Sequence, residues 1–184
     1  LMFKFVFFFT DAHYMKKIFT LLFSIFYLLG NAQLDTDHWF APMSARSGTS
    51  NLQSLLYLST NETTPFAVQI FSNNVLYTVV TLSKGNPISV NIPGGNMMAT
   101  NQSDLFTPSN KGMYVKGPKK FYANYRFEIT NHAEIITSKG LAGIGTTFYA
   151  AMAPNTAATS YVSSNIGILA TEDNTSVTIS GYDP

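Results

Sequence analysis

The chain of 184 residues contains no cysteine, which excludes a disulfide scaffold, a cysteine-ligated zinc site and a thiol nucleophile. Charged residues make up only 11% of it, against roughly 25% in an average soluble domain. The net charge is +1, so we expect no nucleic-acid partner. Histidine occurs three times, and the Gly-x-Ser-x-Gly and His-Glu-x-x-His motifs are both missing. We therefore expect no enzyme, and we assign no catalytic residue, cofactor or metal ion.

A targeting segment is predicted at residues 15–33, where Met15 and two lysines precede an apolar run and then small and polar residues. The apolar run is shorter than the roughly 20 residues that a membrane-spanning helix needs. The pattern indicates a signal peptide cleaved after Ala32 or Gln33, and a buried core helix is the alternative. Residues 1–14 are expected to be an upstream extension that is not native, or else part of a membrane hairpin.

Export would place the protein outside the cell or on its surface, with membrane contact only through the signal peptide. An exported chain without cysteine fits a bacterial envelope better than a eukaryotic secretory pathway. Removing the leader takes away three bases and one acid, which turns the net charge of +1 into −1. The chain stops directly after a strand-like run at residues 176–180, so we expect it to be a fragment of a longer protein.

After residue 33, apolar side chains recur at every second position, which predicts β-strands. The clearest strand covers residues 121–129, where odd-numbered positions are apolar and even-numbered positions are polar or tyrosine. Residues 166–180 predict a hairpin around an acidic, asparagine-containing turn, whereas residues 96–117 predict a loop. Further strands are predicted at 66–72, 75–82, 88–92, 134–137 and 146–152.

Many strands separated by turns, with no helical period after the leader, predict an all-β protein. We expect an antiparallel β-sandwich-like domain over residues 34–184 that is truncated at its C-terminal end and preceded by a signal-peptide helix. A barrel is the alternative architecture. Trp39 and Phe40 are expected to anchor the first strand, which Pro42 ends.

Three stretches carry a resemblance to a known family: His-Trp-Phe-Ala-Pro at 38–42, Lys-Gly-Leu-Ala-Gly-Ile-Gly-Thr-Thr-Phe-Tyr at 139–149, and Ile-Leu-Ala-Thr-Glu-Asp-Asn-Thr-Ser-Val-Thr-Ile at 168–179. Together they resemble the IgGFc-binding protein N-terminal domain family. The resemblance is to its versions in secreted surface proteins of Bacteroidetes, which are associated with gliding motility and type 9 secretion. It implies an all-β, non-enzymatic module near the N-terminus of an adhesin-like protein.

A basic cluster precedes the strand at residues 121–129, and it suits anionic partners. The candidate ligand-binding residues are Lys116, Lys119, Lys120 and Tyr122. A solvated loop or a charge-protected edge strand is the alternative interpretation. The expected function is adhesion or ligand binding, with glycans, mucins or host or cell-surface proteins as partners. The alternatives are a structural spacer or assembly domain of a large surface protein, or an accessory domain of a secreted carbohydrate-active enzyme.

Two acidic segments have the chemistry of cation ligands. Asp35-Thr36-Asp37-His38 offers oxygen and imidazole donors, but we interpret it as the solvated N-terminus of the mature chain. Glu172 and Asp173 would supply too few oxygens for calcium by themselves, and we interpret them as an exposed turn.

Overall fold

The computed structural model describes residues 16–20, 33–44, 53–99, 102–129, 132–151 and 166–181. The chain divides into two units, Leu1–Ala32 and Gln33–Pro184. In the first unit the described residues are 16–20, which are helical and exposed. No helix within the described segments is long and apolar enough to cross a membrane. The predicted upstream extension and most of the predicted signal peptide lie outside the described residues.

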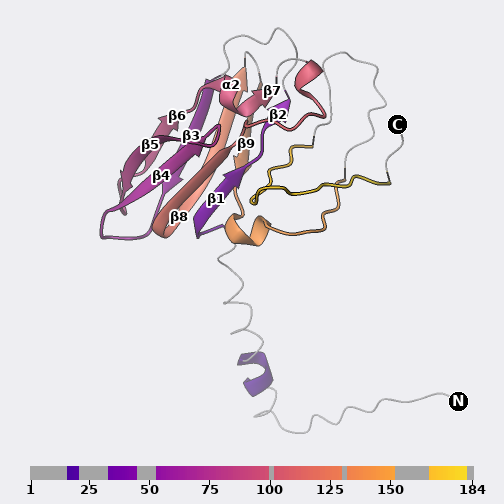
Figure 1. The fold of residues 1–184 in the computed structure, drawn as a ribbon. Coiled ribbons are helices and arrows are strands. Elements are labelled where there is room, and N and C mark those ends of the chain that lie inside the picture. The colour runs from indigo at the N-terminus through magenta and orange to yellow at the C-terminus, as the bar shows by residue number, and fades with distance from the viewer. Residues whose placement is uncertain are drawn as a thin grey trace, which may run out of the picture. The chain divides into compact units, whose positions relative to one another are not determined.

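The second unit is built on a seven-stranded antiparallel sheet (Figure 1). A separate parallel pair joins β2 (Met43–Ser44) and β7 (Met98–Ala99). The all-β fold predicted from the sequence is confirmed. The order along the main path of the sheet is β5 (Val75–Leu82), β4 (Phe66–Ser72), β8 (Met113–Ile129), β3 (Gln53–Ser59) and β6 (Ile88–Asn91), while β1 (Asp35–Phe40) and β9 (His132–Thr137) also pair with β8.

Strand β8 serves two halves of this sheet. Its first part pairs with β1 and β4, and its second part pairs with β3 and β9. Residues 117–120 lie between the pairings with β4 and β3, where Pro118 removes no ladder hydrogen bond. Strand β1 shifts register there, because Asp37 pairs with Lys116 and Asp35 pairs with Phe121. A β-carbon on Gly117 would approach the rings of Phe66 and Phe121 to 3.2 and 3.3 Å, so the absence of a side chain lets both rings pack there. The change of partners lets the sheet curl around its core.

The core lies on the inner face of the curled sheet, and the predicted alternation accounts for it. Phe66, Val68 and Ile70 of β4 are buried, as are the odd-numbered residues at the start of the predicted strand in β8. The two free ends of the curl approach each other, since the Tyr77 hydroxyl donates to the Asn91 carbonyl at 3.1 Å. The other buried members of the core are Phe40, Leu56, Leu58, Leu82, Ile92, Met97, Met113 and Val115.

The predicted loop at residues 96–117 is wrong for most of its described length. The segment holds the end of α2 (Gly94–Met97), β7, the short 3₁₀-helix η1 (Gln102–Asp104) and the start of β8. Met113 and Val115 are buried in β8. Their alternation is too short to be recognised in the sequence, because Gly117 and Pro118 interrupt it. Pairing with β1 on one side and β4 on the other makes this segment a strand.

The predicted C-terminal strands are also corrected. The turn at residues 171–174 is present, with Asn174 at φ 59°, but the flanking residues 166–170 and 175–180 are not assigned as paired strands (Figure 1, yellow). The predicted strand at 146–152 is likewise unassigned over 146–151, and residue 152 lies outside the described part. Alternating apolar residues form a strand only when a neighbouring strand satisfies the backbone, and these segments have no such neighbour among the described residues.

Candidate functional site

Three aromatic side chains form a row across the outer face of the sheet. Trp39 of β1 lies opposite Tyr114 of β8, and Phe71 of β4 lies opposite Tyr114 on its other side. The centroids of Trp39 and Tyr114 are 5.2 Å apart with ring planes 18° apart, and those of Phe71 and Tyr114 are 5.7 Å apart at 26°. Aromatic pairs of this kind add about 0.5–1.5 kcal/mol each beyond their burial. We call Trp39, Tyr114 and Phe71 the aromatic row.

Strand alternation explains why the aromatic row faces outward. Phe40, Ile70 and Val115 are the chain neighbours of the three rings, and they are buried in the core. Successive side chains of a strand point to opposite faces, so Trp39, Phe71 and Tyr114 stand on the other face, where all three are half-buried. The sequence prediction that Trp39 anchors the strand is therefore met by stacking on Tyr114 and not by burial in the core.

A polar rung runs beside the aromatic row. Asp37 of β1 lies opposite Lys116 of β8, and Gln69 of β4 lies opposite Lys116 on the other side. The Lys116 ammonium lies 5.6 Å from the centroid of the Phe71 ring, so it leans toward β4 and away from β1. The rung thus places an amide, a carboxylate and a cation next to three rings.

The Asp37 carboxylate fixes the centre of the aromatic row. One carboxylate oxygen accepts a hydrogen bond from the Tyr114 hydroxyl, and the other accepts one from Thr36 Oγ1 at 2.7 Å. Burial raises the pKa of Tyr114 to about 12, and the hydrogen bond and charge of Asp37 act in the same direction. Tyr114 therefore stays a neutral donor at physiological pH, and Asp37 has a partner on each oxygen.

The outer face remains apolar beyond the aromatic row, on strand β5. Leu76 lies opposite Phe71, and Val79 lies opposite Gln69. Their side chains are 51% and 49% exposed. An apolar patch that continues from three rings onto two exposed aliphatic side chains is typical of a surface that contacts another molecule.

The Asp-Thr-Asp-His segment is not the solvated terminus that the sequence predicts. It forms β1, and His38 is completely buried because it points into the core between β1 and β8. Its Nε2 donates to the Phe121 carbonyl at 2.8 Å and to the Asp35 carbonyl at 3.3 Å, and burial lowers its pKa. His38 Nδ1 is buried without a hydrogen-bond partner among the described residues.

Both acids of this segment accept hydrogen bonds from within the fold. Asp35 accepts hydrogen bonds from its neighbour Thr36 N at 2.8 Å and from Leu141 N at 2.7 Å, and so it joins β1 to the short helix η2 (Gly140–Gly143). Within the described ranges, no group of three or more His, Cys, Asp or Glu residues is placed to hold a metal ion. Asp173 and Glu172 lie in an exposed turn, as the sequence predicts.

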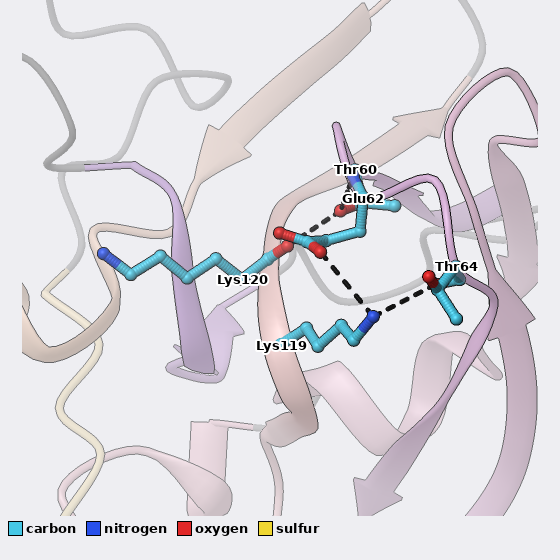
Figure 2. A network of polar contacts seen from close by, with 5 residues as sticks. All are labelled: Thr60, Glu62, Thr64, Lys119 and Lys120. Carbon is cyan, nitrogen blue, oxygen red and sulfur yellow. Dashed lines mark hydrogen bonds and ion pairs between the residues drawn. The ribbon is translucent and has the colours of Figure 1, made fainter.

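The predicted ligand-binding residues do not gather into one site. Lys119 pairs with Glu62 at 3.6 Å, and its ammonium lies 3.5 Å from the Thr64 carbonyl (Figure 2). The Lys120 side chain points the other way in Figure 2, while its carbonyl accepts from Thr60 Oγ1 at 2.8 Å.

The remaining candidates stand at even-numbered positions of β8. Lys116 lies beside the aromatic row, and Tyr122 is half-buried opposite Ser59. The predicted cluster is therefore not a loop, because Lys116, Lys119 and Lys120 all belong to β8. Lys111, just before β8, donates to the Gly95 carbonyl at 2.6 Å.

The class of this protein follows from its fold and from this outer face, because comparison with known proteins gives no match that would assign it. No family model, no curated protein and no solved structure matches the chain. The structure defines an all-β protein whose curled antiparallel sheet carries an aromatic row and a polar rung on its outer face.

Proposed function

We propose that the chain is a non-enzymatic binding module of an exported cell-surface protein and that it binds glycans through the aromatic row. The observation that carries this proposal is the stacking of Trp39, Tyr114 and Phe71 on an outer face. Sugar rings present apolar C–H groups that pack on aromatic side chains, while their hydroxyl groups need polar partners. Gln69 and Lys116 are such partners within the neighbouring rung.

The location of the module rests on the sequence. The leader pattern at residues 15–33 supports export, and the resemblance to the IgGFc-binding protein N-terminal domain family supports a role in adhesion at a bacterial surface. The ionisable groups of β1 support a binding role without catalysis, since Asp35, Asp37 and His38 are each held by hydrogen bonds within the fold. Mucin chains and other cell-surface glycans are the proposed partners.

The test uses the fluorescence of Trp39, which is the single tryptophan of the chain and belongs to the aromatic row. The full chain is titrated with a panel of neutral and acidic oligosaccharides. We expect a saturable change in emission, and we expect Phe71→Ala to weaken binding at least tenfold while Tyr114→Phe, which keeps the ring, weakens it less. Ile135→Ala, an exposed position on β9, is the matched control. Glycan binding that leaves Trp39 emission and the Phe71→Ala affinity unchanged would refute the site.

A second candidate function is assembly, and strand β5 favours it. Val75, Leu76 and Val79 are between 49% and 62% exposed on a strand at the end of the sheet order. Exposed apolar side chains on such a strand favour pairing with another molecule. Sedimentation of the full chain against Val79→Lys tests this function, which predicts a concentration-dependent dimer that the substitution abolishes.

A further inference from the structure

We infer that the ligand of this face is an anionic polysaccharide that follows β8 and binds Lys116 and Lys120 through its carboxylate or sulfate groups. The inference rests on the proposed function, because it names the class of glycan that the aromatic row accepts. It also separates the lysines of β8 into two that face a ligand and one that is used by the fold.

Lys116 is an exposed cation whose ammonium is not engaged in an ion pair with the described residues around it. The acid opposite it, Asp37, has both oxygens occupied by Tyr114 and Thr36. The exposed ammonium lies over Phe71, so an anion bound to it would hold the attached sugar against the aromatic row.

Lys120 is, like Lys116, an exposed lysine at an even-numbered position of β8. Its side chain is exposed and points away from Lys119 and Glu62 (Figure 2). The stretch between the two lysines lies at the register shift of β1, where Asp37 pairs with Lys116 and Asp35 pairs with Phe121. Tyr122 follows at the next even-numbered position, so two cations and a ring succeed one another beyond Tyr114.

Two separate cations favour a polymer over a single sugar. An exposed ion pair contributes little by itself and is screened by salt. Two such contacts on one chain add their effects, because the second forms within an already bound ligand. A polysaccharide with charges along its length can reach both lysines at once, whereas a monosaccharide reaches one.

Lys119 supplies the internal control. Its ammonium is 3.6 Å from Glu62 and 5.9 Å from the Phe66 ring centroid, which turns it toward the loop between β3 and β4. A ligand on the outer face therefore does not need it. If binding depended on charge alone, substituting any of the three lysines would weaken it equally. The Lys119 substitution therefore distinguishes a specific binding surface from a general basic patch.

The experiment measures binding of polygalacturonate and of neutral dextran to the full chain, by Trp39 fluorescence and by calorimetry at low and high salt. We expect polygalacturonate to bind more tightly than dextran, and more weakly at high salt. Lys116→Gln and Lys120→Gln should each weaken binding by up to about fivefold, and the double substitution by about tenfold or more. Lys119→Gln should leave the affinity unchanged, and Lys116→Arg should retain it.

The outcomes separate this inference from the proposed function. Equal binding of dextran and polygalacturonate, with no effect of the lysine substitutions, overturns the anionic ligand and leaves glycan binding in place. Binding of neither polymer, and of no member of the oligosaccharide panel, overturns both. A loss in Lys119→Gln as large as in Lys116→Gln, or equally tight binding of duplex DNA that Phe71→Ala does not weaken, reduces the interaction to general charge attraction and overturns the inference.

Discussion

Replacing Gly140 with alanine tests the contact between strand β1 and the short helix η2. Gly140 opens η2 with φ 59°, in the left-handed region that favours glycine. A β-carbon there would lie 2.5 Å from the Asp35 Cβ and closer still to its Oδ2. Asp35 cannot keep its position beside that carbon, and its hydrogen bond from Leu141 N is lost with it.

The expected loss in the free energy of unfolding has two parts. The left-handed backbone costs an alanine about 1–2 kcal/mol. Losing a hydrogen bond to a charged acceptor costs about 1.5–3 kcal/mol, and the lower end applies because Leu141 is exposed and water replaces part of the interaction. Gly140→Ala should therefore destabilise the protein by about 3 kcal/mol. Gly85→Ala is the matched control, since Gly85 has φ 79° and a β-carbon at that position would have no neighbour within 4 Å.

The assay is urea unfolding of the full chain, followed by Trp39 fluorescence. Gly85→Ala should lose only the backbone part, about 1–2 kcal/mol. In an Asp35→Gly background both the Cβ contact and the hydrogen bond are absent, so the further effect of Gly140→Ala should fall to that same value. Equal losses for the two glycine substitutions, or an unchanged effect of Gly140→Ala in the Asp35→Gly background, would refute the role assigned to Asp35.

Three further predictions concern polar groups of β1 and β8. The Tyr114 phenol should titrate near pH 12 by ultraviolet absorption, and Asp37→Asn should lower that pKa. Because the pKa is higher in the folded state than in the unfolded state, the contribution of Tyr114 to stability should fall between about pH 10 and pH 12. The His38 imidazole should titrate below its usual pKa of 6.5 by NMR. The stability that it contributes is therefore present above pH 6.5 and lost on acidification. His38→Gln should remove this part of the pH dependence in unfolding experiments. Tyr125→Phe should leave the free energy of unfolding unchanged or raise it by up to about 1 kcal/mol, since its buried hydroxyl and the neighbouring Ser54 hydroxyl form no hydrogen bond of good geometry in the described part of the chain; a loss above 1 kcal/mol would contradict this.

Much of the fold was predictable because strand alternation is local. The buried set at Phe66, Val68 and Ile70, and that at Phe121, Ala123 and Tyr125, follow from apolar residues at every second position. The turn around Asn174 follows from a residue that tolerates positive φ. These features depend on neighbours along the chain, so the amino-acid order alone specifies them.

The candidate site was predictable only in part. The lysines of β8 stand out in the sequence, yet nothing local shows that Lys119 turns toward Glu62 while Lys116 stays beside Phe71. The outward positions of Trp39 and Phe71 follow from alternation with buried neighbours. Their stacking on one tyrosine depends on the register of three strands that are distant in sequence.

By itself, the sequence determined which segments have two faces and which face is apolar. Only the tertiary structure decided that β8 changes partners at residues 117–120, that Met113 begins a strand, and that residues 166–180 keep their turn without pairing. The physical reason is that a strand is completed by hydrogen bonds to another strand. Side-chain alternation prepares a segment for that pairing, but the partner and register come from the packing of the whole chain.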